Sequence, residues 1–173
     1  MKTTLNKIRK CHPCGIKPGS NGELSGFMKL MHYLGKTQVD DEPVSILQIL
    51  DSNGIDDAIW CLRAVDGYDK EIRLFAVWCA RQVEHLMTDQ RSKDALDTAE
   101  RFANGAATSI ELKAARTAAG AATGTAAGTA AWAAAGAAAR TAAWTAAWAA
   151  AGAVQAEKLH RLCAEIDNRS NQD

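Results

Sequence analysis

The sequence predicts an all-α protein, a compact multi-helix bundle whose C-terminal helices are rich in alanine and pack closely. Three observations support this prediction. Residues 117–156 are dominated by alanine, the best helix former. Residues 43–105 place apolar side chains three and four positions apart, as an amphipathic helix does, between capping and stop signals. No stretch of the chain alternates β-branched and polar residues, the pattern expected of a half-buried strand.

The size and charge of the chain limit the classes of protein to which it can belong. Its 173 residues suit one domain with an ordinary core, so we expect a single helical domain over residues 1–173. Its 20 basic and 20 acidic residues balance, so neither nucleic acid nor a membrane surface is expected as a partner. No apolar run follows the basic N-terminus, which disfavours a secretory signal. We therefore expect a cytoplasmic protein with five reduced cysteines.

Residues 1–40 are predicted to be an irregular N-terminal segment. The sequence CHPC at residues 11–14 is followed by a run of turn formers at residues 17–22. The following apolar side chains have helical spacing, which predicts an amphipathic helix from Glu23 to Leu34. Gly35 is placed to end this helix.

Two apolar helices are predicted next. Asp41 is expected to cap the first helix, and Pro43 suits its first turn, where the missing N–H group costs no hydrogen bond. The sequence DSNG, Asp51 to Gly54 with Asn53 among them, is then a stop signal for this helix. The second helix is expected to start at Asp56 or Asp57 and to end at Val65.

Two more apolar helices follow. One is predicted from Asp69 to Met87, and apolar side chains between Leu74 and Cys79 surround most of its circumference. We therefore interpret it as the central buried helix. The other is predicted from Lys93 to Ala103, with Ser92 as its cap.

Residues 108–166 are predicted to form the Ala-rich helices. They open with a capping box at Thr108–Glu111, and a four-residue repeat built on Ala-Ala extends over residues 117–156. Because an α-helix has 3.6 residues per turn, each repeat rotates the fourth residue by about 40°, and one rod of this length would span about 60 Å. That exceeds a domain of this size, so we expect two or more shorter helices, broken between Gly120 and Gly128 or at Gly136.

Three interpretations of the repeat are open. In the first, which we favour, small residues let helix backbones approach closely and Trp132, Trp144 and Trp148 fill the gaps. The second is a membrane span, suggested by the GxxxG spacing between Gly120 and Gly128, although the stretch lacks the Leu, Ile and Phe of real spans. The third is a threonine surface that resembles the Ala-rich helical antifreeze proteins, but here the threonines rotate around the helix.

Four residues near the two ends of the chain form a candidate zinc site. Cys11 and Cys14 lie in the irregular segment, and His160 and Cys163 lie on one face of a final amphipathic helix, Leu159–Ile166. A set of three cysteines and one histidine suits tetrahedral zinc. The alternative is that Cys163 is an apolar packing residue of that face. Apart from this structural zinc, no cofactor is expected.

A second candidate site consists of charged residues beside the apolar helices. Ordinary surface ion pairing explains them, and the alternative is a recognition patch with Trp60 or Trp78 as an aromatic anchor. Neither a phosphate-binding loop nor a convincing acid–base pair is present in the sequence, so we expect no enzymatic activity. The candidate binding residues are Asp56, Asp57, Trp60, Arg63, Arg73 and Arg81.

Three segments of the chain resemble a known family. Residues 56–65 (DDAIWCLRAV), 73–81 (RLFAVWCAR) and 97–105 (DTAERFANG), followed by Ala-Ala-Trp repeats, are similar to small helical immunity proteins of bacteria and phages. The resemblance covers roughly Asp56 to Cys163. It implies an all-α inhibitor that protects a cell by binding and neutralising a partner toxin or defence protein. It brings no catalytic motif, and the CHPC segment lies outside it.

Three functions follow from these observations. The first is a non-enzymatic binding protein, an immunity-like or phage-encoded inhibitor that neutralises a partner protein. The second is a protein that sequesters a small anionic ligand such as a nucleotide in a polar pocket among Arg63, Arg73 and Arg81. The third is a self-associating structural helical module, since Ala/Gly faces can also pair between chains and form a homo-oligomer.

Overall fold

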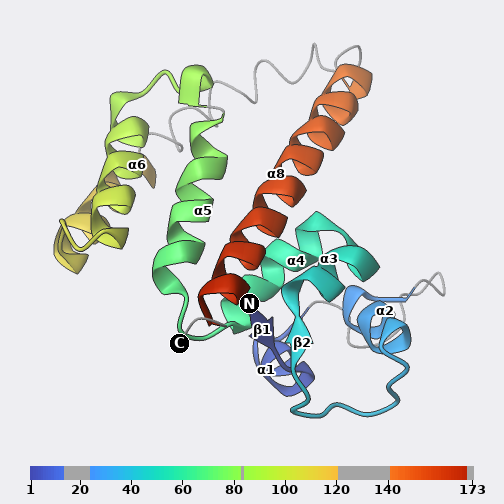
Figure 1. Ribbon diagram of the computed structural model, residues 1–173. Coiled ribbons are helices and arrows are strands. Elements are labelled where there is room, and N and C mark those ends of the chain that lie inside the picture. Colours follow the sequence, from blue (N-terminus) through green and yellow to red (C-terminus); the bar gives the residue numbers. More distant parts are fainter. Residues whose placement is uncertain (14–23, 83, 121–140, 171–173) are drawn as a thin grey trace. The chain divides into compact units, whose positions relative to one another are not determined.

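The fold is all-α, as predicted (Figure 1). The computed structural model describes residues 1–13, 24–82, 84–120 and 141–170. The chain divides into two units: unit 1 comprises residues 1–68 and 154–173, and unit 2 comprises residues 69–153. The single helical domain expected over residues 1–173 remains a prediction.

Unit 1 contains a short β pairing that the sequence did not predict. Strand β1 (Lys2–Thr3) pairs antiparallel with β2 (Val44–Ser45), so that Lys2 lies opposite Ser45 and Thr3 opposite Val44. Two-residue strands are too short to show an alternating pattern, which is why this pairing left no sequence signal. The side-chain hydroxyl of Thr3 is buried and donates a hydrogen bond to the carbonyl oxygen of Ala64.

The other elements of unit 1 are short helices with identifiable boundaries. Ser25 caps α2 (Gly26–Tyr33), its hydroxyl accepting a hydrogen bond from the Met28 N–H at 3.3 Å, and Gly35 follows the helix with a φ of 66°. The predicted end of this helix at Gly35 is therefore confirmed, but the helix begins at Gly26 and not at Glu23 as predicted. Besides the end of α8 (Thr141–Ser170), the helices are α1 (Leu5–Lys10), α2 (Gly26–Tyr33), α3 (Ile46–Asn53), α4 (Ile55–Cys61) and the 3₁₀ turn η1 (Leu62–Ala64).

The predicted start of α3 is wrong. Ser45, not Asp41, caps this helix, and its N–H donates to the Gln48 side chain at 2.8 Å to complete a capping box. Val44 belongs to the β pairing and is therefore extended, so the helix cannot begin at Pro43. Asp41 instead accepts a hydrogen bond from the Thr4 hydroxyl at 3.2 Å.

Apolar residues from every helix of unit 1 form its core. On α8, the buried residues Leu159, Cys163 and Ile166 are four and three positions apart, so they share one helical face as predicted. Burial of Cys163 matches the packing role that was the alternative to a metal ligand. The remaining apolar side chains of this core are Met1, Leu5, Ile8, Phe27, Leu30, Val44, Ile46, Ile49, Leu50, Ala58, Cys61, Leu62, Ala64 and Val65.

Unit 2 is built around two helices that pack on each other, α5 (Asp69–Arg81) and α6 (Gln90–Ala103). Helix α5 ends before the predicted Met87 and is followed by the 3₁₀ turn η2 (Glu84–Leu86). Among the residues of α5, only Phe75 and Val77 are buried. The helix is therefore amphipathic, and the prediction that it is the central buried helix is wrong. Trp78 stacks on Phe75 with ring centroids 6.4 Å apart.

Of two further helix starts in unit 2, one differs from the sequence prediction and the other agrees with it. Asp89, not Ser92, caps α6, its carboxylate accepting a hydrogen bond from the Arg91 N–H at 2.9 Å. The predicted capping box at Thr108 is confirmed, because Thr108 and Glu111 exchange backbone-to-side-chain hydrogen bonds of 2.7 and 3.2 Å.

The Ala-rich region is described only in part. Residues 109–120 are helical, and α8 runs without a break through Gly152 to Ser170. The final helix predicted over residues 159–166 is therefore the end of a longer one. The breaks predicted beyond Gly120, at Gly128 or Gly136, lie outside the described residues. In the described part of the chain, no helix combines the length and the apolar character needed to cross a membrane.

Candidate functional site

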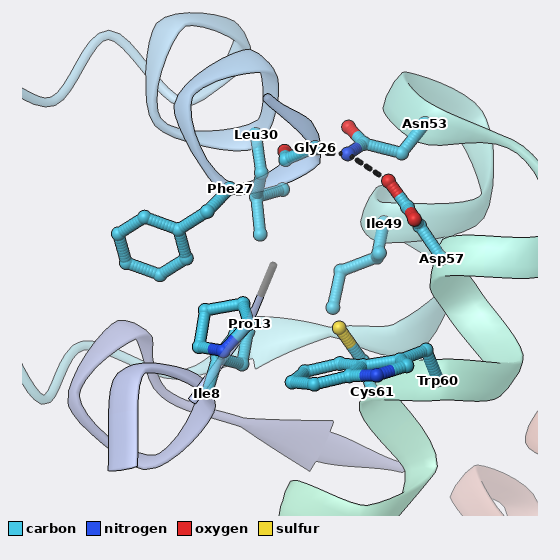
Figure 2. A pocket seen from close by; sticks show the side chains of 10 residues that line it. All are labelled: Ile8, Pro13, Gly26, Phe27, Leu30, Ile49, Asn53, Asp57, Trp60 and Cys61. Carbon is cyan, nitrogen blue, oxygen red and sulfur yellow. Dashed lines mark hydrogen bonds between the residues drawn. The ribbon is translucent and has the colours of Figure 1, made fainter. Parts of the chain in front are cut away.

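A cleft of about 150 Å³ opens in unit 1 among α1, α2, α3 and α4 (Figure 2). This volume is comparable to that of a dry protein cavity that admits benzene. Asn53 and Asp57 supply the polar side chains of its lining, and the other residues are apolar. The full lining is Ile8, Pro13, Gly26, Phe27, Leu30, Ile49, Asn53, Asp57, Trp60 and Cys61.

Two helices supply most of the lining because their residues recur at helical spacing. On α4, Asp57, Trp60 and Cys61 are three and four positions apart and therefore project from one face. On α2, Phe27 is buried, and Leu30 follows three residues later on the same face. The cleft is thus formed where the apolar faces of two short helices meet incompletely.

A hydrogen-bond network forms the polar end of the cleft. The Asn53 side-chain amide donates to the Gly26 carbonyl at 2.6 Å and to Asp57 Oδ2 at 2.7 Å, as Figure 2 shows. Its own oxygen, Oδ1, accepts from the Ser52 hydroxyl at 2.7 Å. Asn53 therefore uses its donors and its acceptor to hold α2, α3 and α4 together. Asp57 Oδ1 accepts no hydrogen bond from any described residue.

Gly26 permits the Asp57 carboxylate to approach the first turn of α2. A Cβ atom at position 26 would lie 2.3 Å from Asp57 Oδ2, which is closer than two unbonded atoms can be. The first turn of a helix has unpaired N–H groups and attracts negative charge. The glycine thus makes room for a carboxylate at a place where the helix favours one.

The other end of the cleft is apolar and chemically inert. Burial, with a smaller contribution from the negative charge of Asp57, raises the pKa of the Cys61 thiol to about 12. The thiol is therefore protonated at neutral pH and is a poor nucleophile. The Arg63 guanidinium lies over the Trp60 ring, 4.4 Å from the ring centroid, and Arg63 Nε donates a hydrogen bond to the Trp60 carbonyl oxygen at 2.9 Å.

The predicted binding residues fall into different surroundings. In unit 1, Asp57 and Trp60 line the cleft, Arg63 stacks on Trp60, and Asp56 is exposed outside the lining. In unit 2, the Arg73 guanidinium lies 4.8 Å from the centroid of the Phe102 ring.

Arg81, also in unit 2, is surrounded by carboxylates. Its guanidinium donates hydrogen bonds to Glu84 at 3.0 Å and to Asp97 and Glu100 at 2.7 Å each. These bonds raise the pKa of Arg81, and the bond to Glu100 contributes most. The ion-pairing interpretation therefore fits Arg81. Three carboxylates more than balance its single positive charge, which disfavours an anionic ligand there.

The predicted zinc ligands are not gathered where the structure describes them. Cys11 caps the end of α1 and is half-buried, Cys163 lies in the core, and His160 is exposed. Among described residues, no three His, Cys, Asp or Glu side chains form a group that could hold a metal ion. Cys14 lies outside the described residues, so the zinc site remains a prediction.

Of the ten residues that line the cleft, sequence reasoning proposed only Asp57 and Trp60 as site residues. Asn53 was assigned to a stop signal, and Gly26 and Phe27 fall within the amphipathic helix predicted from Glu23 to Leu34. The side chains it missed join the cleft through contacts between α2, α3 and α4, and no local pattern reports such contacts. The one usable signal was a glycine in the first turn of an amphipathic helix, where a better helix former would be expected.

No protein-family model, curated protein or solved structure matches this chain. The resemblance of residues 56–65, 73–81 and 97–105 to immunity proteins therefore remains a prediction. Of these three segments, the first supplies the α4 wall of the cleft. The cleft of unit 1 is the feature from which a function can be inferred.

Proposed function

We propose that this protein is a non-enzymatic, immunity-like inhibitor that neutralises a partner protein by binding it. The cleft of unit 1 would receive one side chain of that partner. The observation that carries the proposal is an apolar concavity lined by Trp60 and Phe27. Buried aromatic residues around a small pocket are typical of the anchor points that supply most of the binding energy in protein interfaces.

The volume of the cleft favours a side chain over a whole ligand. Pockets for small molecules and cofactors usually enclose about 300–1,000 Å³. At about 150 Å³, this cleft holds one side chain but not a nucleotide. The size of the cleft therefore supports binding of a partner's side chain there over binding of a nucleotide.

Apolar surface continues beyond the cleft along and around α2. Leu24 and Tyr33 are 50% and 53% exposed. A second hollow of about 540 Å³ includes Phe27, which also lines the cleft, together with Met28 and Met31. The same hollow is also lined by the polar residues Arg9, Thr37 and Gln38. Aromatic residues and methionine are enriched in protein interfaces, whose rims are polar, so this surface fits one.

The chemistry of the cleft supports a non-enzymatic role. Its titratable lining groups are Cys61, whose raised pKa keeps the thiol protonated, and Asp57, which Asn53 holds by a hydrogen bond. Nucleophilic catalysis needs a thiolate or a base beside the nucleophile. Here the Cys61 thiol is protonated, and no hydrogen bond joins it to Asp57.

Site-specific photo-cross-linking tests the proposal. Benzoylphenylalanine at position 56, beside the cleft, should trap one protein in cells that carry the gene. The same group at position 110, which is 80% exposed in unit 2, serves as the control and should not trap it. The trapped protein would then be purified, and its activity and affinity measured by calorimetry.

The variant Trp60→Ala gives the decisive comparison. Loss of an aromatic anchor should weaken binding of the purified partner by at least about tenfold and restore the partner's activity. Circular dichroism would confirm that the variant is folded. A partner that binds Trp60→Ala as tightly as the unchanged protein would refute the proposal.

A further inference from the structure

The charge at one end of the cleft identifies the kind of side chain it receives. We propose that the occupant is a lysine of the partner protein, whose ammonium group binds Asp57 Oδ1 while its methylene chain lies along the apolar walls. This inference rests on the proposed function and specifies the chemistry of the same site.

Asn53 and Asp57 form the polar end of the cleft. Figure 2 shows Asn53 and Asp57 together on one side of the cleft. Both amide N–H groups of Asn53 are used by Gly26 and Asp57, and its oxygen already accepts from Ser52, so Asn53 has no donor left for an occupant. Asp57 Oδ1 accepts no hydrogen bond within the described chain and belongs to a charged carboxylate. The cleft therefore presents an acceptor and a negative charge, which a cationic donor would complement.

The occupied Oδ2 of Asp57 favours an ammonium over a guanidinium group. An arginine binds a carboxylate best through both oxygen atoms at once. Here Oδ2 already accepts from Asn53 at 2.7 Å, and it lies so close to α2 that not even a Cβ atom fits at Gly26. A single accessible oxygen suits the compact charge of an ammonium group.

The apolar walls of the cleft suit the methylene chain of a lysine. Leu30, Ile49 and Cys61 provide an apolar lining on which four methylene groups can be buried. The nearby cation Arg63 does not line the cleft, because it is held on the Trp60 ring and bonded to the Trp60 carbonyl. The lining therefore combines an apolar wall with one anionic end, which matches a lysine side chain.

Small probes test this inference on the full chain. The probes are n-butylammonium, n-butylguanidinium and 1-butanol, which share one apolar tail and differ in the end group. Their affinities would be measured by NMR titration of the Gly26 amide, the Asn53 side-chain amide and the Trp60 indole. We expect n-butylammonium to bind about tenfold more tightly than 1-butanol, because its charge-assisted hydrogen bond adds to the contacts of the tail. It should also bind more tightly than n-butylguanidinium, which cannot use both carboxylate oxygens here.

Two matched variants locate the charge. Asp57→Asn should abolish the preference for n-butylammonium, whereas Asp56→Asn removes the same charge one residue away and should retain it. The ranking of the three probes on the unchanged protein decides the matter even if Asp57→Asn does not fold.

Several outcomes would overturn the inference. These are equal affinity for all three probes, a preference for n-butylguanidinium, no binding of any probe, or the same loss in Asp56→Asn. If the partner still depends on Trp60 while the probes show no preference, only the lysine is refuted. A partner that is indifferent to Trp60 refutes the proposed function itself.

Discussion

Replacing Gly26 by alanine tests the close approach of α2 and α4 directly. Alanine is the better helix former, so a helix propensity argument alone predicts stabilisation by about 0.5 kcal/mol. The new Cβ atom, however, would lie 2.3 Å from Asp57 Oδ2 and 3.1 Å from its Cγ. The carboxylate must therefore move and lose its hydrogen bond from Asn53, which costs about 1.5 kcal/mol for a charged acceptor at a half-buried site.

The two terms leave a net loss of about 1 kcal/mol in the free energy of unfolding, or about 3 °C in Tm for a chain of this size. Urea unfolding followed by circular dichroism measures it. Gly120→Ala is the matched control, because nothing lies within 4 Å of the position that a Cβ atom would take at that helical glycine. This control substitution should stabilise the protein by about 0.5–1 kcal/mol.

A double-mutant cycle tests the cause. Asp57→Ala removes the clashing carboxylate, so adding Gly26→Ala to it should cost nothing further and should even stabilise slightly. If Gly26→Ala destabilises the Asp57→Ala protein as much as it does the unchanged chain, the clash with Asp57 is not the reason and the account of this end of the cleft is wrong.

Two other predictions concern a helix cap and a thiol. Ser45→Ala should lower the free energy of unfolding by about 1 kcal/mol, because it removes the capping box of α3. Asp41→Ala should change this free energy by less than half as much. Chemical unfolding measures both variants, and a larger effect of Asp41→Ala would refute Ser45 as the cap. Cys61 should resist a thiol-specific reagent in the folded protein at pH 8, because burial raises its pKa to about 12, whereas the half-buried Cys11 should react before it. Mass-spectrometric mapping of the labelled sites checks this order, and early labelling of Cys61 would contradict it.

The boundaries of several helices could be predicted from the sequence because their signals are local. Gly35 ends α2, and Thr108 and Glu111 form a capping box, as expected from residues within four positions of each other. The start of α3 could not be predicted in the same way. Val44 pairs with Thr3, some forty residues away, and this pairing moves the cap from Asp41 to Ser45.

The candidate site was predicted only where it lies on one helix. Asp57 and Trp60 stand three positions apart on α4, so their common face follows from helical geometry. Arg81 was placed in the same candidate patch, but its hydrogen bonds to Glu84, Asp97 and Glu100 give it a structural role within unit 2. Charge and spacing along the chain do not tell which partner a long side chain will choose.

The sequence by itself determined that this protein is helical, because backbone hydrogen bonds and the repeat of apolar side chains in a helix both act within four residues. Only the tertiary structure decided that there is a cleft and what lines it. Asn53 reaches back to Gly26 on another helix, and Asp57 fits there because position 26 lacks a side chain. Such contacts depend on how finished helices pack against one another, which short-range patterns do not encode.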